Sequence, residues 1–306
     1  MSSADLPTGA QYEIRHGGHR AVITEVGATL RHYSVEGRDV IEDFPSGQMC
    51  PAGHGQVLAP WPNRLQGGTY RWAGTTRQLP LSEPSRHNAI HGLVRWQAWV
   101  VTEQAGRWVT LTHRIHPRDG YPFLIDIELR YELDESGLTV SATAINRGPE
   151  PAPFGLGFHP YLRLGTGMVD GLILECPAAI TLITDDAGIP TGRQAVEGTA
   201  FDFRSPRAIG ALELDTAYTD LSSGSDGLHR VSLSGPGPAP ESTTVWMDAG
   251  FGHVMVFSGD TLGPERRRKA LAVEPMTCPP NALATGEAVI SLEPGVTWAG
   301  RWGIQP

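Results

Sequence analysis

The strongest constraint on the fold is a strict alternation of apolar and polar residues, because a period of two fits a strand with one buried face. The alternation is longest in residues 125–133, where Ile, Ile, Leu, Tyr and Leu are separated by Asp, Glu, Arg and Glu. Turn-forming residues occupy 134–137, and a second alternating segment covers 138–144. The two segments therefore predict an antiparallel β-hairpin.

Several shorter segments, each bounded by Gly, Pro, Asp or Ser, predict further strands. They cover residues 21–26, 108–115, 172–174, 243–247, 253–257 and 289–292. No segment matches them in helical periodicity, and 37 Gly and 25 Pro among 306 residues disfavour long helices. We therefore expect an all-β fold, a single large antiparallel β-sandwich that occupies residues 1–306 as one domain.

Two polar stretches need a separate interpretation. Residues 222–240 contain four glycines, and we interpret them as a surface loop rather than a linker between domains. The charged run 265–269 contains three consecutive arginines, which could bind an anion. A solvated turn is the commoner form of such a run, so we assign it no function.

Charge and hydropathy limit the partners that the chain can have. The net charge is −9 at pH 7, which repels a polyphosphate backbone, so we expect no nucleic-acid partner. No apolar segment approaches the roughly 18 residues of a membrane-spanning helix, and residues 1–18 lack the apolar stretch of a signal peptide. Cys50, Cys176 and Cys278 are far apart, which fits a reducing compartment. We expect a cytoplasmic protein with no membrane association.

Four polar segments are flanked by Gly, Pro and aromatic residues, as the lining of a pocket would be. In residues 59–65, prolines stiffen the backbone beside Asn63 and Arg64, whose side chains can donate hydrogen bonds to a ligand. A structural salt bridge of Arg64 is an equally good interpretation. In residues 86–93, His87 and His91 belong to a polar cluster that could bind a polyhydroxylated ligand.

The remaining segments carry two groups suited to proton transfer. His159 lies between Gly157 and Pro160, and Pro160 biases it toward an extended conformation that presents its side chain. Glu274 ends an apolar stretch, where burial would raise the pKa of its carboxyl. An imidazole and a carboxyl can perform acid–base chemistry without a cofactor. We expect no metal either, because Asn88 replaces the glutamate of the helical zinc motif between His87 and His91.

These four segments, in this order, resemble the motifs of the aldose 1-epimerase (galactose mutarotase) family. The corresponding residues are Asn63-Arg64, His91-Gly92, the glycine-rich segment that ends in His159-Pro160-Tyr161, and Glu274-Pro275. The resemblance spans nearly the whole chain. It implies the single β-sandwich of that family, a galactose mutarotase-like supersandwich, and interconversion of the α and β anomers of aldohexoses such as glucose or galactose.

The resemblance also implies roles for individual residues. His159 would protonate the ring oxygen as general acid, and Glu274 would take the proton of the anomeric hydroxyl as general base. Arg64 and His91 would bind sugar hydroxyls, and Asp215 resembles the substrate-binding carboxylate of the family. Aromatic residues could form one wall of the pocket or pack in the core. The candidates are Trp61, Trp96 and Tyr161.

Three departures from the common family pattern leave the choice of sugar open: Leu93, Leu162 and Asn281. One alternative is an epimerase of a phosphorylated or otherwise anionic hexose, for which Arg86, Arg95 and Arg163 are candidate phosphate ligands. A second alternative is a catalytically silent carbohydrate-binding protein. The third is a glycosidase with Glu274 and Asp215 as paired carboxylates.

Overall fold

The predicted hairpin lies within the largest sheet of this computed structural model, which describes residues 6–165, 167–237 and 240–306. Strand β12 (Ile125–Asp134) pairs antiparallel with β13 (Gly137–Asn146), with Leu129 opposite Ala142. All five apolar positions of the first alternating segment are buried, and the polar positions between them are partly or fully exposed. The hairpin prediction is therefore confirmed.

This hairpin belongs to a nine-stranded sheet. In spatial order its strands are β10 (Val100–Ala105), β11 (Trp108–Ile115), β12, β13, β27 (Thr297–Gln305), β23 (Ser242–Met247), β22 (His229–Ser234), β17 (Ile173–Glu175) and β20 (Arg207–Ala208). The neighbouring strands pair antiparallel.

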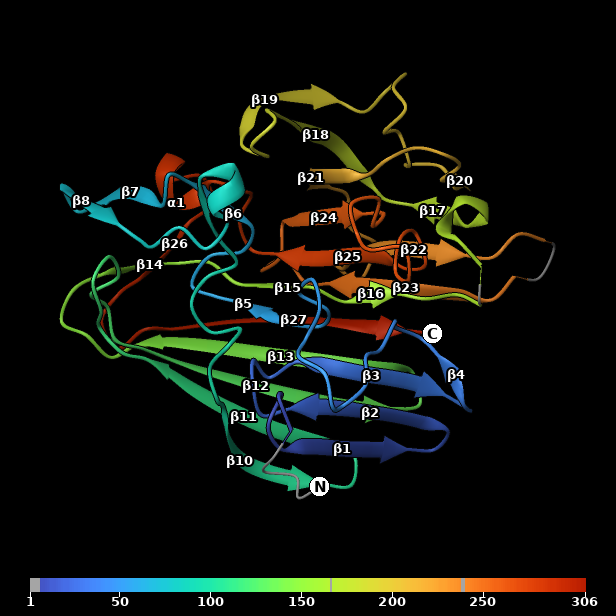
Figure 1. Cartoon of the computed structure of the whole chain (residues 1–306), viewed down its shortest axis with the longest axis horizontal. Coiled ribbons are helices and arrows are strands. Elements are labelled where there is room, and N and C mark those ends of the chain that lie inside the picture. The colour runs from blue at the N-terminus through green and yellow to red at the C-terminus, as the bar shows by residue number, and fades with distance from the viewer. Residues whose placement is uncertain (1–5, 166, 238–239) are drawn as a thin grey trace.

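An eight-stranded sheet forms the other large layer. Its strands are β19 (Pro190–Ala195), β18 (Ala178–Thr184), β21 (Asp215–Leu221), β24 (His253–Phe257), β25 (Leu271–Met276), β15 (Gly157–Phe158) and β5 (Val57–Leu58), and β16 (Tyr161–Leu162) also pairs with β25. In the view of Figure 1 its strands β21, β24 and β25 overlap β20, β17 and β22 of the nine-stranded sheet, and β18 and β19 lie at the top. Phe158 of this sheet packs against Trp302 of β27, with ring centroids 5.0 Å apart, so the two sheets share one apolar core.

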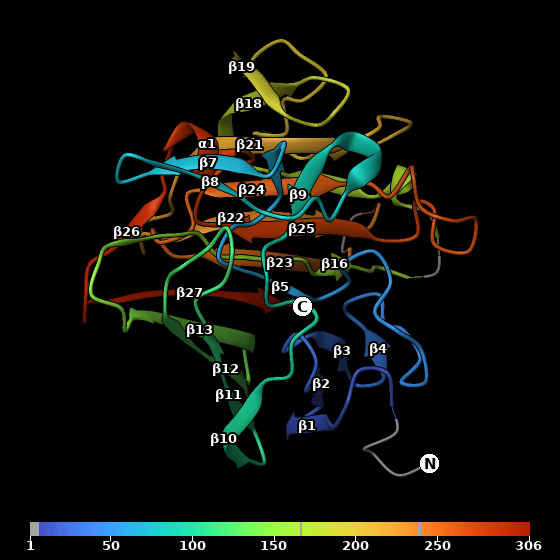
Figure 2. The same ribbon diagram turned by 60° about the vertical axis from the view of Figure 1, so that its left-hand side comes forward.

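A four-stranded sheet from the beginning of the chain covers part of the nine-stranded sheet. It consists of β1 (Gln11–His16), β2 (His19–Thr24), β3 (Leu30–Val35) and β4 (Arg38–Asp39). Figure 2 shows β1 to β3 as a layer beside β10 to β13. The buried hydroxyl of Tyr131 in β12 donates a hydrogen bond of 2.7 Å to the carbonyl of Ala28, which ties the two layers together.

Short ladders and turns complete the fold. The two-stranded ladders are β14 (Ala152–Phe154) with β26 (Ile290–Leu292), β6 (Arg64–Gln66) with β9 (Asn88–Ile90), and β7 (Thr69–Trp72) with β8 (Thr75–Gln78). Among the described residues, the helical elements are two 3₁₀ turns, η2 (Pro84–Arg86) and η3 (Val169–Gly171), and one short helix, α1 (Ala282–Thr285). In the described part of the chain, no helix is long and apolar enough to cross a membrane.

The all-β, antiparallel prediction is confirmed, and each of the shorter predicted segments contains a strand whose ends differ by at most a few residues. The loop prediction for residues 222–240 is wrong in part, because β22 lies inside that stretch; residues 238 and 239 lie outside the described part of the chain. Val231 and Leu233 are buried and alternate with partly exposed residues, but the surrounding serines and glycines hide this short pattern in the sequence.

The solvated-turn interpretation of residues 265–269 is also wrong in part. Arg268 is only 6% exposed, and its guanidinium contacts the carboxylates of Asp170 and Asp260 at 2.9 and 2.7 Å. Arg266 reaches the buried carboxylate of Glu42 at 3.4 Å. Part of this charged run therefore joins separate loops through ion pairs instead of facing water.

Because buried and exposed residues alternate in β12, substitutions at neighbouring positions should change the free energy of unfolding by very different amounts. Replacing the fully buried Leu129 with Ala removes apolar contacts and leaves a cavity, so we expect a loss of about 2–5 kcal/mol in the free energy of unfolding. The matched control, Glu128→Ala, lies on the exposed face of the same strand and should change it by no more than about 0.5 kcal/mol. Urea denaturation measures both values, and equal losses would contradict the assigned register.

Candidate active site

The strand pairing around β25 brings His159 and Glu274 together. Gly157 of β15 lies opposite Met276, and Tyr161 of β16 lies opposite Ala272, so this register places His159 opposite Glu274. The Nε2 atom of His159 is 3.4 Å from the Oε1 atom of Glu274, and the two residues are only 5% and 2% exposed. Two segments more than 100 residues apart in sequence thus form one buried imidazole–carboxyl pair.

Burial changes the proton affinity of both members of this pair. Burial is the main cause that lowers the pKa of His159 from 6.5 to about 3, and the charge of His54 adds to the effect. Burial also raises the pKa of Glu274 well above its ordinary value; the charge of Asp215 acts in the same direction and that of Arg64 opposes it. In the unliganded site, the pair therefore favours a neutral imidazole and a protonated carboxyl.

A tight loop holds the imidazole of His159. Gly53 has a φ of +80°, and a Cβ atom at this position would lie 2.9 Å from Cδ2 of His159, so only glycine fits without displacing the ring. The backbone N–H of Gly55 donates to the carbonyl of His159, and the N–H of His159 donates to the carbonyl of Gln56. The ring of Tyr161 stacks on that of His159 at a centroid distance of 4.9 Å.

Arg64 is held in place by a carboxylate that sequence analysis did not identify. Its Nε and Nη2 atoms donate to the two carboxylate oxygens of Glu83 at 2.9 and 3.2 Å. Glu83 also accepts a hydrogen bond from the buried side chain of Asn88. The salt-bridge interpretation of Arg64 is thus correct, and Arg64 lines the pocket as well.

Asn63 and His91 are connected through their backbones. Both have a positive φ, 53° and 62° respectively, and the N–H of His91 donates to the carbonyl of Asn63 at 2.9 Å. The next residue, Gly92, lies against the backbone of Ala59, where a Cβ atom would come within 2.0 Å of the carbonyl oxygen. The His-Gly order therefore has a steric cause: glycine allows the close approach that positions His91.

Asp215 begins β21 at the mouth of the pocket, with 45% of its side chain exposed. Its carboxylate is 3.9 Å from Arg64 and also 3.9 Å from Arg86. These distances leave the carboxylate available to a ligand, whereas Glu83 is already engaged by Arg64.

These groups line one cavity of about 320 Å³, a volume in the range of small-ligand sites. Its lining includes six predicted site residues: Asn63, Arg64, His91, His159, Asp215 and Glu274. Inside it, Oε2 of Glu274 and Nδ1 of His91 are buried without a hydrogen-bond partner among the described residues. Such atoms are costly to bury unless a ligand satisfies them.

Other candidates lie elsewhere. His87 is exposed in a left-handed conformation at the end of η2 and is not part of the lining. Trp61 is part of the buried core and Trp96 is 43% exposed, so only Tyr161 of the three aromatic candidates lines the cavity. Arg86 and Arg95 line it, but Arg163 does not.

Leu162 and Asn281, two of the departures from the common family pattern, have structural roles and do not line the cavity. Leu162 is buried in the core. The side-chain oxygen of Asn281 accepts from the backbone N–H of Gln66, and the N–H of Asn281 donates to the carbonyl of Arg64. Asn281 thus supports the strand that carries Arg64 rather than lining the cavity.

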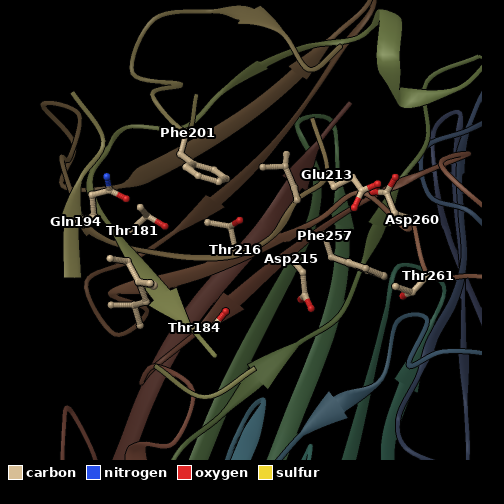
Figure 3. A pocket seen from close by; sticks show the side chains of 13 residues that line it. Thr181, Thr184, Gln194, Phe201, Glu213, Asp215, Thr216, Phe257, Asp260 and Thr261 are labelled. Atoms are coloured by element: carbon tan, nitrogen blue, oxygen red, sulfur yellow. The ribbon is translucent and has the colours of Figure 1, made fainter. Parts of the chain in front are cut away.

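A second groove, of about 370 Å³, adjoins the cavity and shares Asp215, Phe257 and Thr261 with it. Figure 3 shows Asp215 and Phe257 side by side, with the threonines of β18 and β21 farther along the groove. Phe257 and Glu83 were both missed by sequence analysis. Neither belongs to a spaced motif, and only the three-dimensional arrangement connects them with Arg64 or His159.

No group of three or more His, Cys, Asp and Glu side chains in the described residues is arranged to hold a metal ion. The described cysteines Cys50, Cys176 and Cys278 are free and buried. The cavity is lined by charged and titratable side chains: the His159–Glu274 pair, Arg64 with Glu83, His91, Arg86, Arg95, and Asp215 at the mouth.

Fold and site together define a class: an antiparallel β-sandwich with a buried imidazole–carboxyl pair in a cavity of about 320 Å³. The family model described as aldose 1-epimerase matches residues 10–305. The chain belongs to the aldose 1-epimerase family.

Individual relatives agree with this assignment. The chain is 33% identical over 293 residues to the uncharacterized protein YihR of Escherichia coli, covering 94% of this chain and 90% of that protein. It is 28% identical over 230 residues to galactose mutarotase of Sus scrofa, covering 67% of this chain and 65% of that protein.

Solved structures show the same fold. An aldose epimerase homologue from C. elegans superimposes with a TM-score of 0.85 at 20% identity, over 97% of this chain and 98% of that chain. Galactose 1-epimerase from Lactobacillus acidophilus has a TM-score of 0.78 at 20% identity, over 95% and 92% of the two chains.

The raised pKa of Glu274 predicts an unusual effect on stability. Above the ordinary carboxyl pKa, the unfolded chain releases this proton while the folded chain keeps it, so wild-type stability falls as pH rises toward the folded-state pKa. Glu274→Gln resembles the protonated carboxyl and lacks this slope. We expect the variant to be more stable than wild type at pH 8 and the difference to shrink toward pH 4.

Urea denaturation at several pH values measures this difference. The exposed Glu197→Gln serves as the control and should show no such pH-dependent gain. A Glu274→Gln variant that is no more stable than wild type at pH 8 would show that the carboxyl ionises normally in the folded protein.

Proposed function

We propose that the protein is an aldose 1-epimerase that interconverts the α and β anomers of a free aldohexose such as glucose or galactose. The observation that carries this proposal is the buried His159–Glu274 pair, 3.4 Å apart, in a cavity of about 320 Å³. Membership of the aldose 1-epimerase family supports it. Mutarotation needs one proton donor and one proton acceptor on the same sugar, and this pair supplies both.

Ring opening moves two protons. Glu274 takes the proton from the anomeric hydroxyl, the C1–O5 bond breaks as the C1 carbonyl forms, and His159 gives a proton to O5. Rotation about C1–C2 then presents the other face of the aldehyde. Ring closure reverses both transfers, so the opposite anomer leaves and the protein is restored.

The proton balance of the pair fits this cycle. Each half-reaction takes one proton from the sugar and returns one, so the pair holds a single proton before and after. The neutral form favoured by burial, with the proton on Glu274, and the form with the proton on His159 differ only by transfer within the pair. The reaction can therefore begin with the proton on either residue of the pair. A pair that holds two protons, or no proton, would be inactive.

The other residues lining the cavity bind and orient the sugar. Arg64 is held rigidly by Glu83, so its free donor can meet a ring or hydroxyl oxygen with little loss of side-chain entropy. The buried ring of His91 and the amide of Asn63 offer further hydrogen bonds. The carboxylate of Asp215 at the mouth can accept hydrogen bonds from two sugar hydroxyls.

Substitution of the acid–base pair is the direct test. Glu274→Gln and His159→Asn should each reduce the turnover number by at least about a hundredfold while sugar affinity changes little, because proton transfer contributes only to the transition state. Polarimetry of freshly dissolved α-D-glucose and α-D-galactose at low buffer concentration measures turnover, and calorimetry measures affinity. Near wild-type turnover in either variant would remove that residue from the mechanism.

The same assay separates the other candidate functions. Glu197→Gln is the control for an unrelated exposed carboxyl and should keep wild-type turnover. Sugar binding by the wild-type protein without faster mutarotation would favour a silent carbohydrate-binding protein. Release of a reducing sugar from a glycoside would favour a glycosidase.

A second candidate substrate is an anionic hexose, which the cations of the cavity favour. Arg86 and Arg95 both line it. Arg95 is half-buried and, among the described residues, forms no ion pair with a carboxylate, whereas Arg64 is neutralised by Glu83. A buried cation without a counter-ion is stabilised by an anionic ligand.

Arg95→Gln distinguishes the two substrates. If the natural sugar is anionic, kcat/KM for hexose 6-phosphate should fall by roughly tenfold or more, as expected for loss of a charge-assisted hydrogen bond, while kcat/KM for glucose stays nearly constant. The exposed Arg301→Gln should affect neither sugar. Equal effects on both sugars would indicate that Arg95 is structural and would leave the neutral hexose as the substrate.

A further inference from the structure

Three aromatic rings lie parallel in a stack behind the acid–base pair. His54 stacks on Tyr161 with centroids 3.7 Å apart and an interplanar angle of 7°, and Tyr161 stacks on His159 at 4.9 Å and 9°. His54 and Tyr161 are each 2% exposed. The mechanism above uses His159 but gives no task to His54, although burying a titratable ring costs free energy.

His54 is anchored at both ring nitrogens. Nδ1 is 2.8 Å from the carbonyl oxygen of Pro51, which can only accept, and Nε2 is 2.7 Å from Oε2 of Glu42. A neutral imidazole has one N–H, whereas the protonated ring has two and can satisfy both acceptors. With Glu42 ionised, this geometry requires a positively charged His54.

The surroundings favour the ionised form of Glu42, which is 7% exposed. Burial by itself raises the pKa of Glu42, and the hydrogen bond and charge of His54 lower it; independently of His54, the charges of Arg266 and Arg163 also lower it, and the net pKa lies below the ordinary value. Arg266 lies 3.4 Å from the same carboxylate oxygen and 3.5 Å from Nε2 of His54. Because the carboxylate is much closer to Nε2 than Arg266 is, the Nε2 proton belongs in the bond to Glu42.

Glu42 also holds Tyr161 through the backbone. Its N–H donates to the carbonyl of Tyr161 at 2.8 Å, and the hydroxyl of Tyr161 donates to the carbonyl of Ala52 at 3.1 Å. Tyr161 is therefore fixed at its backbone and at its hydroxyl, with His54 on one face and His159 on the other.

We propose that Glu42 and His54 are positioning residues for the reaction: their buried ion pair clamps Tyr161 flat against His159 and fixes a positive charge behind it. The inference rests on the proposed function, because its benefit is to the acid–base pair. The clamp keeps the imidazole directed at Glu274. The charge opposes addition of a second proton to the pair, which would block the cycle.

Other titratable groups surround His54 and His159 and also influence their charges. Around His54 these are Glu42, Arg266, Tyr161 and the thiol of Cys50, whose Sγ lies 3.2 Å from the carbonyl of His54. Around His159 they are Glu274, His91, Tyr161 and, farther away, Arg95. Of these groups, only His54 and Arg95 are cations that lower the pKa of His159, and His54 contributes more.

The first measurement is the protonation state of His54 in the wild-type protein. The eleven histidines can be resolved by ¹⁵N NMR of labelled protein, with His54→Gln used to assign the His54 signals. Both ring nitrogens of His54 should carry protons at pH 7. A neutral His54 with one unprotonated nitrogen would overturn the proposal without any need for a folded variant.

The second measurement uses Glu42→Gln, which removes the carboxylate and lets His54 become neutral. The acid limb of kcat/KM and the pKa of His159 from NMR should both rise by on the order of one pH unit, because the positive member of the ion pair, which is nearer to His159 than Glu42 is, loses its charge. At pH 7, kcat should fall about tenfold and KM should change by less than about twofold, because positioning affects the transition state. Circular dichroism at each pH confirms that the variant is folded.

His229→Gln is the matched control, since His229 is a buried histidine in β22 of the other large sheet. It should lower thermal stability without moving the acid limb or the ratio of kcat to KM. If Glu42→Gln has only that structural effect, the proposal is wrong. If the wild-type protein turns over no sugar, the proposed function fails, and the NMR titration of His159 still tests the charge effect separately.

Discussion

The pairing of β15 and β16 with β25 is the constraint on which the rest of the site depends. It places His159 opposite Glu274 across two neighbouring backbones, and both side chains point into the same cavity. A shift of β25 by one residue would turn Glu274 to the opposite face of the sheet and leave the imidazole without its partner. The packing of Phe158 on Trp302 and the hydrogen bond from the N–H of Val273 to the carbonyl of Pro160 oppose such a shift. The apolar core therefore also sets the geometry of the polar pair.

Burial of this pair changes the proton affinity of both groups and is also a cost to stability. The same loss of water that lowers the proton affinity of His159 raises that of Glu274, so two groups with different ordinary pKa values come to hold one proton between them. The fold supports this arrangement through the backbone, whereas Nδ1 of His159 and Oε2 of Glu274 have no hydrogen-bond partner among the described residues. Glycine at position 53 admits the imidazole, and glycine at position 92 lets the His91 backbone meet that of Ala59. At position 53 a side chain would collide with the ring of His159, and at position 92 it would collide with the backbone of Ala59.

Much of the fold could be predicted from the sequence because β12 and β13 each have one buried and one exposed face. In such strands apolar and polar residues alternate, and this alternation is visible in the sequence. Strand β25 has no such signal, since all six of its residues are buried and it reads as a continuous apolar run. The roles of His159 and Glu274 could be expected from the family resemblance, and their proximity follows from strand register, which no local pattern contains. Glu83 could not be found, because it meets Arg64 through folding alone. His87 was misplaced because nearness to His91 in sequence does not mean a shared direction after a 3₁₀ turn.

The charges around the cavity differ in what balances them. Glu83 neutralises Arg64, so Arg64 can approach a sugar oxygen without strongly attracting anions. Asp215 is exposed at the mouth, where hydroxyl groups can reach it in competition with water. Behind the pair, Glu42 balances His54, yet Tyr161 rather than water separates His54 from His159, so the nearer charge is weakly screened on that side. A salt bridge that is neutral as a whole can thus still act on the imidazole of His159, because its positive end is the one that stacks on Tyr161.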